Sequence, residues 1–371
     1  MVLAVPIPKF LVSKDTLGID IGSQSIKITQ LKISGKKWVA ATWTEEVLSL
    51  ESISELSPPE RKSLIIDKLK EIILRERITT KKVCASISGS SVIVRYVKFP
   101  KLAPEQLAKT IEYEAEPYIP FAIADVHLGF HIVKDIEEDG QKKMETILVA
   151  VKKDLIQERI EILQQANLNP TIIDIDAFAL GNALEAAEVL PMTETVVAVN
   201  VGATVTNLVV IENGVSKVVR DIFVAGNNFT KAVQRNLGVD FATAEQMKRQ
   251  YGIQVTPEEK EEAKADKDKT QVSAILSTVA KELTSEIQRS IDYFLAQSPE
   301  TAITKVILTG GSVALPNLTQ YVGQELNLNA EAFKPSIAIE NAQSMVALQN
   351  DVDYKYAVAF GLGVRKEGDS R

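Results

Sequence analysis

LGIDIGSQSIKI, residues 17–28, alternates apolar residues with small or polar ones on both sides of a polar tip, Gly22-Ser23-Gln24. A period of two on either side of a short tip that contains glycine is typical of a β-hairpin. The sequence therefore predicts a hairpin that carries one acid, Asp20, beside its turn.

A second copy of this hairpin occurs at residues 196–214, VVAVNVGATVTNLVVIENG. When Asn200 is placed on Asp20, Gly202 falls on Gly22 and the apolar positions match without a gap. Such self-similarity indicates an internal duplication. The chain is predicted to contain two related halves, each of which begins with a strand hairpin.

The composition is that of an ordinary globular protein with more than one domain: 371 residues, 45% hydrophobic and 25% charged. The net charge of -7 argues against general affinity for nucleic acid or anionic lipid, because such binding depends on clustered Lys and Arg. No apolar run is long enough to span a bilayer, and residues 1–15 lack the basic start and cleavage site of a signal peptide. The single cysteine, Cys84, is expected to be a buried structural thiol.

Residues 91–176 are predicted to form an inserted unit with the element order β-α-β-β-α-β, which resembles a ferredoxin-like module. The expected strands are 91–98, 125–134, 144–151 and 171–176, and the expected helices are 104–116 and 154–166. The last strand could belong to the flanking domain instead. His127 and His131 lie four residues apart on one of these strands, about 13 Å from each other, so they cannot share a metal ion.

The remaining elements follow from apolar periodicity and from charge. Helices are predicted at 59–77, 177–189, 227–237, 243–251 and 271–296, and the charge-dense run 257–270 is predicted to be a solvated loop or helix end.

The two hairpin tips and a later glycine pair are candidate nucleotide contacts. Glycine at a tip lets backbone N–H groups face a phosphate, so Gly22 and Gly202 could hold a polyphosphate from two sides. Asp20 suits a hydrated Mg²⁺ ion, which takes few direct carboxylates, and Lys27 can place a charge on the phosphates. Gly310-Gly311 would leave room for a ribose and a base.

GIDIGSQSIK, VNVGATVT and LTGGSVALPNL, in this order, resemble the phosphate 1, phosphate 2 and adenosine motifs of the actin, Hsp70 and sugar kinase superfamily. The inserted unit resembles the 1C subdomain of the division protein FtsA. With EYEAEPYIPFAIADVHLGF and EIQRSIDYF, nearly the whole chain resembles the PilM family of cytoplasmic, actin-like type IV pilus assembly proteins.

The resemblance implies an α/β fold, namely a duplicated, FtsA-like actin-like ATPase fold with an inserted subdomain. The expected subdomains are 1A at 15–90 and 170–192, the 1C-like insert at 91–169, 2A at 193–225 and 300–353, and 2B at 226–299; a C-terminal helix at 354–366 could return to 1A.

By the same resemblance, ATP and Mg²⁺ bind between the duplicated halves, with Asp20 holding the metal through water. The expected contacts are Asp20, Gly22, Ser23, Gln24, Ser25, Lys27, Asn200, Gly202, Ala203, Thr204, Gly226, Glu245, Lys248, Gly310, Gly311 and Ser312. Glu245 and Lys248 have an alternative reading, because the run from Thr243 to Gln246 could be a helix capping box. Asn200 stands where the superfamily carries an acid. An uncharged amide holds hydrated Mg²⁺ less well and cannot take a proton from water, so hydrolysis is expected to be weak at most.

The resemblance also implies a partner, the N-terminal cytoplasmic tail of the inner-membrane protein PilN, besides other pilus platform proteins and self-association. The chain would then lie in the cytoplasm, peripheral to the inner membrane. The candidate docking residues are Glu112, Glu116, Tyr118, Ile119 and Phe121, although the aromatic and apolar ones could be plain core. An acidic, aromatic edge suits a peptide with apolar anchors and basic flanks.

Two rival functions share these motifs: an FtsA-like, filament-forming cytoskeletal protein and a small-molecule kinase of the superfamily. A kinase needs a carboxylate base near the transferred phosphate. Asp174 or Asp176 could supply it, but an acid at a strand end could equally cap the next helix.

Overall fold

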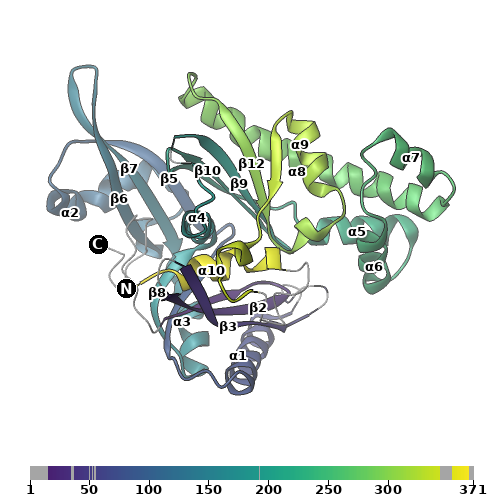
Figure 1. Ribbon diagram of the computed structural model, residues 1–371. Helices are drawn as coiled ribbons and strands as arrows, with labels where there is room; N and C mark the ends of the chain where they lie inside the picture. The colour runs from purple at the N-terminus through teal and green to yellow at the C-terminus, as the bar shows by residue number, and fades with distance from the viewer. Residues whose placement is uncertain are drawn as a thin grey trace.

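The computed structural model describes residues 16–34, 37–49, 51, 53, 56–191, 193–342 and 353–366. Their strands form three sheets, two with five strands and one with three (Figure 1). The two five-stranded sheets belong to the two halves of the molecule, and the three-stranded sheet forms an inserted unit at one end.

The first half is built on the sheet β3-β2-β1-β4-β8. Its strands are β1 (Thr16–Ile21), β2 (Ser25–Ser34), β3 (Lys37–Val47), β4 (Lys82–Ile87) and β8 (Asn169–Ile175). β1 and β2 form the predicted hairpin, and β4 runs parallel to both β1 and β8. Val83 and Ala85 pack with helices α1 (Pro58–Arg75) and α3 (Lys153–Gln165), whereas Cys84 faces α4 (Asp176–Ala186) and α10 (Ala357–Gly363). Both faces of the parallel part are therefore buried, as such sheets require, and Cys84 is buried as predicted.

The second half repeats this arrangement with the sheet β11-β10-β9-β12-β13. Its strands are β9 (Thr195–Val201), β10 (Thr206–Glu212), β11 (Val215–Ile222), β12 (Ile303–Thr309) and β13 (Asn329–Ala332). β9 pairs antiparallel with β10 and parallel with β12, just as β1 pairs antiparallel with β2 and parallel with β4. Asn200 lies opposite Asn207 in the second hairpin, as Asp20 lies opposite Lys27 in the first. The predicted duplication is confirmed.

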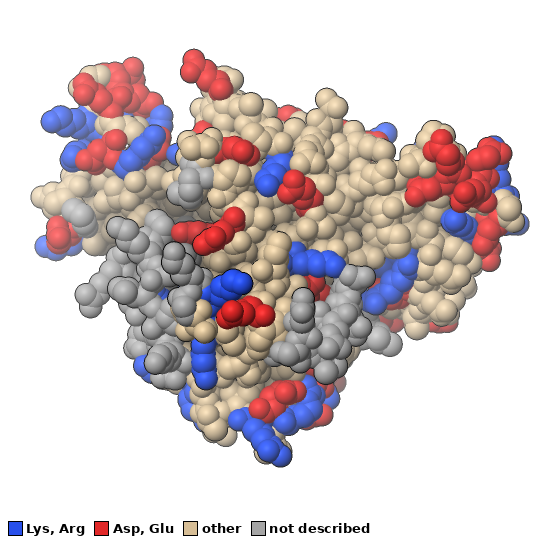
Figure 2. Space-filling view, in the orientation of Figure 1, with Lys and Arg blue, Asp and Glu red and all other residues tan. Residues whose placement is uncertain are grey.

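Helices α5 (Gly226–Leu237), α6 (Phe241–Tyr251), α7 (Pro257–Ala263), α8 (Lys267–Gln297) and α9 (Leu318–Leu326) complete the second half. The run 257–270 is solvated, as predicted, because most of its residues are exposed. The loop alternative is wrong, since the run forms α7, a short turn and the first turn of α8. Thr256 caps α7: its hydroxyl accepts the N–H of Glu259 at 3.2 Å, and the Glu259 carboxylate accepts the N–H of Thr256 at 3.2 Å. Exposed acids gather over this helix (Figure 2).

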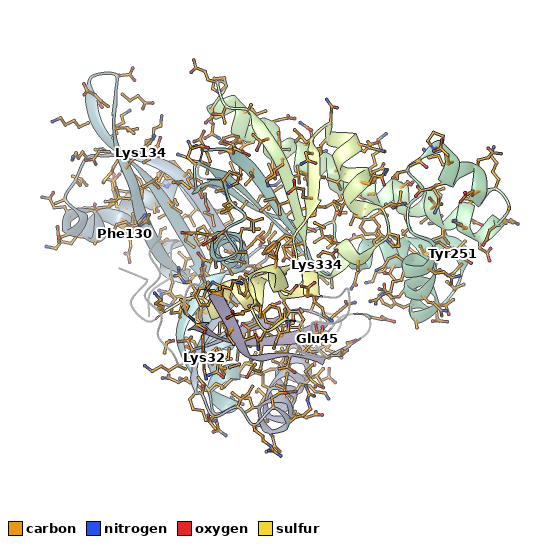
Figure 3. The ribbon with its side chains drawn as sticks, viewed as in Figure 1. Lys32, Glu45, Phe130, Lys134, Tyr251 and Lys334 are labelled. Carbon is orange, nitrogen blue, oxygen red and sulfur yellow. The ribbon has the colours of Figure 1, made fainter. Side chains whose placement is uncertain are left out.

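The inserted unit consists of β5 (Val92–Pro100), α2 (Pro104–Ala115), β6 (Val126–Glu138) and β7 (Gln141–Lys152), with the sheet order β5-β7-β6. The predicted succession β-α-β-β-α-β is confirmed by these elements followed by α3 and β8. β8 joins the sheet of the first half, which was the alternative left open, and α3 packs with α1 in the core of that half. Phe130 and Lys134 on β6 lie at the end of the molecule opposite Tyr251 of α6 (Figure 3).

The C-terminal helix α10 packs against β1 and α4, so the last helix closes the core of the first half (Figure 1). The approach is close: a Cβ atom added to Gly361 would lie 1.8 Å from the carbonyl oxygen of Ala179. On the sheet side of α10, the Thr29 hydroxyl of β2 donates to the carbonyl of Ala359 at 2.7 Å. No helix within the described ranges has the length and apolar composition needed to cross a bilayer.

Candidate functional site: the cleft between the two hairpins

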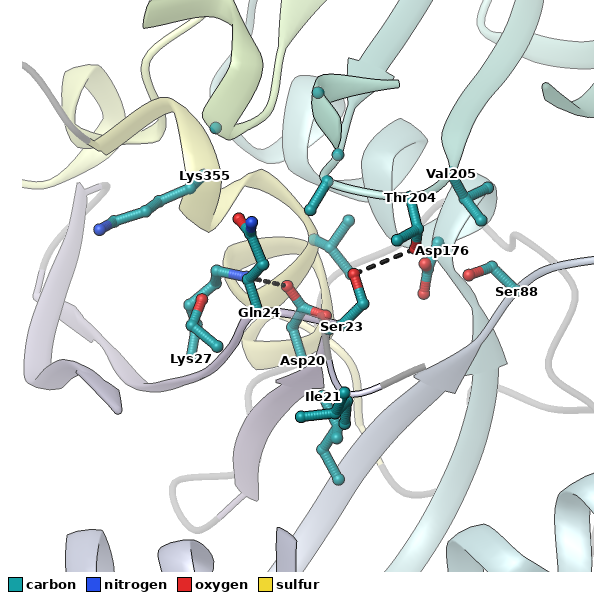
Figure 4. A pocket seen from close by; sticks show the side chains of 18 of the residues that line it. Asp20, Ile21, Ser23, Gln24, Lys27, Ser88, Asp176, Thr204, Val205 and Lys355 are labelled. Carbon is teal, nitrogen blue, oxygen red and sulfur yellow. Dashed lines mark hydrogen bonds and ion pairs between the residues drawn. The ribbon is translucent and has the colours of Figure 1, made fainter. Parts of the chain in front are cut away.

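A cavity of about 620 Å³ lies between the two halves, lined by both hairpin tips, by α5 and α6, and by the loop that follows β12 (Figure 4). This volume is within the usual range of small-molecule sites. Of the predicted nucleotide contacts, the cavity is lined by Asp20, Gly22, Ser23, Gln24, Ser25, Lys27, Asn200, Gly202, Ala203, Thr204, Gly226, Glu245, Lys248, Gly311 and Ser312. Gly310 is the one predicted contact that is not part of the lining.

The first hairpin holds an ion pair at the edge of the cavity. Asp20, near the end of β1, lies opposite Lys27 on β2, and Lys27 Nζ donates to Asp20 Oδ2 at 3.2 Å (Figure 4). Their side chains are only 13% and 12% exposed. The hairpin thus brings one carboxylate and one ammonium group to the same point, where they can serve a metal ion and a phosphate.

The N–H groups of Gly22 and Gly202 are not free to donate to a phosphate, which corrects the prediction for these two amides. Gly22 N–H donates to the carbonyl of Ser25 at 3.1 Å, and Gly202 N–H donates to that of Val205 at 3.1 Å, so both close their own turns. At Gly202 a Cβ atom would lie 2.6 Å from the Val205 oxygen, which explains the glycine. The backbone N–H groups that remain free come from the residues after these two glycines. Within the described residues, the N–H groups of Ser23, Ala203 and Thr204 have no acceptor.

The two tips touch each other across the cleft. Thr204 Oγ1 donates to Ser23 Oγ at 3.0 Å (Figure 4). Beside this contact, Gln24 Nε2 donates to Asn227 Oδ1 at 3.0 Å, and Asn227 Nδ2 donates to the carbonyl of Glu51 at 2.6 Å. A polyphosphate bound between the tips would replace the hydroxyl contact, because both hydroxyls can donate to phosphate oxygens instead.

The glycine pair after β12 has two separate roles. Gly310 has φ +93°, and an added Cβ would lie 2.5 Å from the carbonyl oxygen of Val201, so this glycine permits close packing on β9 and does not make room for a nucleoside. Gly311 has open space beyond a 3.7 Å contact with Lys355 and does line the cavity, as predicted. Ser312 Oγ donates to the carbonyl of Gly202 at 2.8 Å and so joins this loop to the second tip.

Asn200 is part of a hydrogen-bond relay with a fixed direction. Asn200 Nδ2 donates to Asn207 Oδ1 at 2.9 Å, Asn207 Nδ2 donates to Asp221 Oδ1 at 2.8 Å, and Gly89 N–H donates to Asp221 Oδ2 at 2.5 Å. An ionised carboxylate only accepts, so Asp221 requires the amide group of Asn207 to face it. The oxygen of Asn207 then faces position 200, which requires a donor. The structure therefore gives a reason for an amide at position 200.

Glu245 and Lys248 reach the cavity from α6. Lys248 Nζ lies 2.5 Å from Glu245 Oε2 and 3.0 Å from Thr230 Oγ1 of α5. Burial lowers the pKa of Lys248, although the Glu245 carboxylate partly offsets this effect. The alternative reading of a capping box beginning at Thr243 is wrong, because α6 begins at Phe241 and its cap is Asp240, which accepts the Thr243 N–H at 2.9 Å.

Seven charged residues of the cavity were not among the predicted nucleotide contacts: Glu45, Arg61, Glu158, Arg159, Asp176, Arg249 and Lys355. Two of them, Asp176 and Arg159, bear most directly on the chemistry of the site. Asp176, at the first position of α4, accepts from Ser86 Oγ at 2.6 Å, and burial together with the charge of Asp20 raises its pKa to about 6. Arg159 comes from α3. The capping alternative fails for Asp176, because the N-cap residue of α4 is Ile175. Asp174 lies outside the cavity, with its carboxylate 3.3 Å from Arg365. The acid that follows the apolar strand TIIDI was the sequence signal for Asp176; Arg159 had none.

The chain matches the model of the type IV pilus assembly protein PilM family over residues 18–367. It belongs to this family. A structure of the PilM-PilN type IV pilus biogenesis complex is similar to this PilM-family chain, with 24% identity, a TM-score of 0.78 and coverage of 95% of this chain and 99% of the other.

More distant structures share the actin-like fold. The ethanolamine utilization protein EutJ from Carboxydothermus hydrogenoformans has 11% identity and a TM-score of 0.53, with 98% of this chain and 92% of that chain covered. MreB5 of Spiroplasma citri bound to ADP has 12% identity and a TM-score of 0.52, with 94% and 95% covered. These likenesses confirm the predicted fold class for this PilM-family chain.

The predicted docking residues of the PilM-family chain lie at the end of α2 and in the segment after it. Glu112 and Glu116 are exposed, Tyr118 is 40% exposed, and Phe121 is half-buried with Lys152 Nζ 4.8 Å from its ring centre. Ile119 is 7% exposed and packs in the core of the inserted unit, so it supports this face from beneath. Tyr113, at 79% exposure, adds an aromatic side chain to the same helix.

Proposed function

We propose that this PilM-family protein binds ATP with Mg²⁺ between its two hairpins and acts in type IV pilus assembly by docking the cytoplasmic tail of a PilN-like inner-membrane protein. The observation that carries the nucleotide part is the convergence of two duplicated tips, with amide donors that lack acceptors, on one 620 Å³ cavity. MreB5, which shares the fold, has been solved with ADP bound.

The residues of the cavity fit a magnesium nucleotide. The amides of Ser23, Ala203 and Thr204 would hold phosphate oxygens, Lys27 would add a positive charge, and Asp20 would accept from metal-bound water. Mg²⁺ would neutralise phosphate charge when bound. Glu245 and Lys248 lie where the ribose would be held. Since Asn200 is uncharged and engaged with Asn207, hydrolysis is at most weak in this proposal.

For the partner, the exposed acids and aromatic side chains at the end of α2 support docking of a peptide with basic flanks. The partner named with the similar structure, PilN, motivates the choice of ligand. Charge complementarity of this kind speeds association and fixes the orientation of a bound peptide. By this proposal the protein lies in the cytoplasm and reaches the inner membrane through its partner.

Calorimetry with ATP and Mg²⁺ tests the nucleotide part. Gly311→Leu places a large side chain in the open space of the cavity, so ATP affinity should fall at least tenfold while the melting temperature stays near that of the wild type. Undiminished affinity in a folded Gly311→Leu protein would contradict the assignment of the cavity.

A peptide from the N-terminal tail of the PilN-like protein of the same organism tests the partner part. Reversing Glu112 and Glu116 to Lys should weaken its binding several-fold, because basic flanks would lose their acidic contacts. Glu137→Lys with Asp139→Lys changes the net charge of the inserted unit equally and is the matched control, because both positions are exposed and lie near the turn that joins β6 to β7, outside α2. Equal weakening in both double variants would show that only overall charge matters.

Asp176 favours a second candidate, a small-molecule kinase. Its carboxyl group faces the same cavity as Asp20 and has a pKa raised to about 6, which suits a general base. Measurement of ATP consumption with small hydroxylated substrates separates the two functions. Consumption that depends on such a substrate and is lost in Asp176→Asn would favour the kinase.

A further inference from the structure

α3 brings a positive charge to the floor of the cleft. This helix follows β7 of the inserted unit without a break, from Lys152 to Lys153, and packs on α1 and β8 of the first half. From its second turn, Arg159 lines the same cavity as the tips of both hairpins. No motif in the sequence pointed to this residue, and the proposed nucleotide contacts above do not include it.

The guanidinium group of Arg159 has unused donors. Its Nη1 atom is buried and, in the described part of the chain, has no hydrogen-bond partner. The preceding residue, Glu158, is turned to another cation, with Oε1 3.5 Å from Arg61 Nη2 of α1. A buried donor without an acceptor is costly, and it is costlier on a charged group, so this position calls for a ligand that accepts hydrogen bonds.

The surroundings of Arg159 match the far end of a metal-bound polyphosphate. Arg159 shares the cavity with Asp20 and Asp176. Burial lowers the pKa of Arg159, and the negative charges of Asp176 and Asp20 partly offset this effect. Lys27, the nearest cation of the first hairpin, is already held by Asp20. Arg159 therefore supplies charge from the first half, to which Asp20 and Asp176 also belong, whereas Glu245 and Lys248 come from α6 of the second half (Figure 1).

A terminal phosphate has the chemistry that this guanidinium can read. It carries three terminal acceptor oxygens and more negative charge than either inner phosphate, and the planar fork of an arginine binds such a group through two parallel N–H bonds. In the proposed ATP site the amides that follow Gly22 and Gly202 would bind the inner phosphates. We infer that Arg159 binds the terminal phosphate of a nucleoside triphosphate and is the residue by which this site distinguishes ATP from ADP. The inference rests on the proposed ATP site.

The position of Arg159 on α3 also determines which part of the molecule should be stabilised by bound ATP. α3 leads directly from the inserted unit into the first half, so a ligand on Arg159 restrains the helix that joins them. ATP should then slow hydrogen exchange of the amides of α3 more than ADP does.

Calorimetry with ATP and with ADP, each with Mg²⁺, tests the inference on the full chain. In Arg159→Gln, ATP affinity should fall at least tenfold and ADP affinity should change less than twofold; Arg159→Lys should lie between, since a single charge remains without the fork. The control is Arg249→Gln, which removes an arginine at the Glu245 end of the same cavity and should affect ATP and ADP equally. Equal loss of both nucleotides, or of neither, in Arg159→Gln would overturn the inference.

A measurement on the unmodified protein covers the case in which the variants fail to fold. ADP with beryllium fluoride, which mimics a terminal phosphate, should protect the α3 amides from exchange more than ADP alone. Equal protection would overturn the role of Arg159 while leaving the nucleotide site intact. Absence of any nucleotide binding by the wild type would instead refute the proposed function, and the inference with it.

Discussion

The direction of the relay from Gly89 to Asn200 makes a quantitative prediction for Asn200→Asp. The new carboxylate would face Asn207 Oδ1, at the 2.9 Å now spanned by a hydrogen bond. Asn207 cannot turn its amide group round, because Asp221 needs it. The variant loses one hydrogen bond, about 1 kcal/mol, and leaves a buried acceptor without a donor, about 1–3 kcal/mol, so the free energy of unfolding should fall by about 2–4 kcal/mol.

Asp221→Asn supplies the compensating change. An amide at position 221 can still accept from Gly89 N–H and can donate to Asn207, which then turns its own amide group towards position 200. The single variant should therefore be close to wild type in stability, and the double variant Asn200→Asp with Asp221→Asn should recover most of the loss. The predicted coupling in this double-mutant cycle is about 2 kcal/mol.

Urea unfolding of the four proteins at pH 8, where an aspartate at position 200 would be ionised, measures the coupling. Phosphate release should be fastest in the double variant, because only there is a carboxylate at position 200 both ionised and supplied with a hydrogen-bond donor. Its rate should still stay below a typical enzyme's roughly 10 per second. The reasoning is refuted if Asn200→Asp is as stable as the wild type, or if the double variant is no more stable than Asn200→Asp.

Three further outcomes can be measured on simple variants. Gly361→Ala should abolish folding or lower the free energy of unfolding in urea by more than about 3 kcal/mol, because its Cβ would lie 1.8 Å from the Ala179 oxygen. Gly181→Ala in α4, where the added Cβ would lie 4.0 Å from its nearest neighbour, should raise the free energy of unfolding by up to about 1 kcal/mol. The raised pKa of Asp176, about 6, means that folding disfavours its ionised form, so the wild type should gain stability relative to Asp176→Asn as pH falls from 7.5 through 6 to 5, in urea unfolding at each pH. Gly226→Val should weaken ATP binding in calorimetry, since its Cβ would lie 2.3 Å from Ser312 Oγ and displace that hydroxyl from Gly202.

The duplicated hairpins could be predicted because their period of two and their glycine tips are local features of the sequence. The same holds for most of the cavity lining, since residues beside a strand end move with the strand. The role of the Gly22 N–H could not be predicted, because its acceptor, the carbonyl of Ser25, depends on the turn geometry. Gly310 was assigned to the nucleoside for a similar reason: its contact with Val201 joins two strands that are distant in the sequence.

Arg159 and Asp176 show a different limit. Arg159 lies on a helix whose sequence pattern predicts only an apolar face and a polar face. Asp176 had a local signal as an acid after an apolar strand, but the cavity that both share with Asp20 depends on how α3 and α4 pack on the sheet. The charged run at 257–270 shows a third limit. Its charge density indicated an exposed segment but did not indicate a helix there, whereas the cap formed by Thr256 and Glu259 favours one. Local capping chemistry there outweighed composition.

The packing of α10 on β1 has a consequence for the synthesis of the protein. β1 is translated before α10 and the whole second half lies between them, so the core of the first half cannot close until the span from residue 16 to residue 363 has been translated, which takes roughly 17–70 s at about 5–20 residues per second. During that time the buried faces of β1 and α4 are exposed to solvent and to chaperones. The second half waits in part as well: one face of its sheet packs in a core whose buried residues exclude α10, but the other face, with Val196 and Ile307, shares a core with Phe360 of α10. A nonsense mutation just before Ala357 would therefore leave a chain with open apolar surface on both halves, a ready substrate for proteolysis.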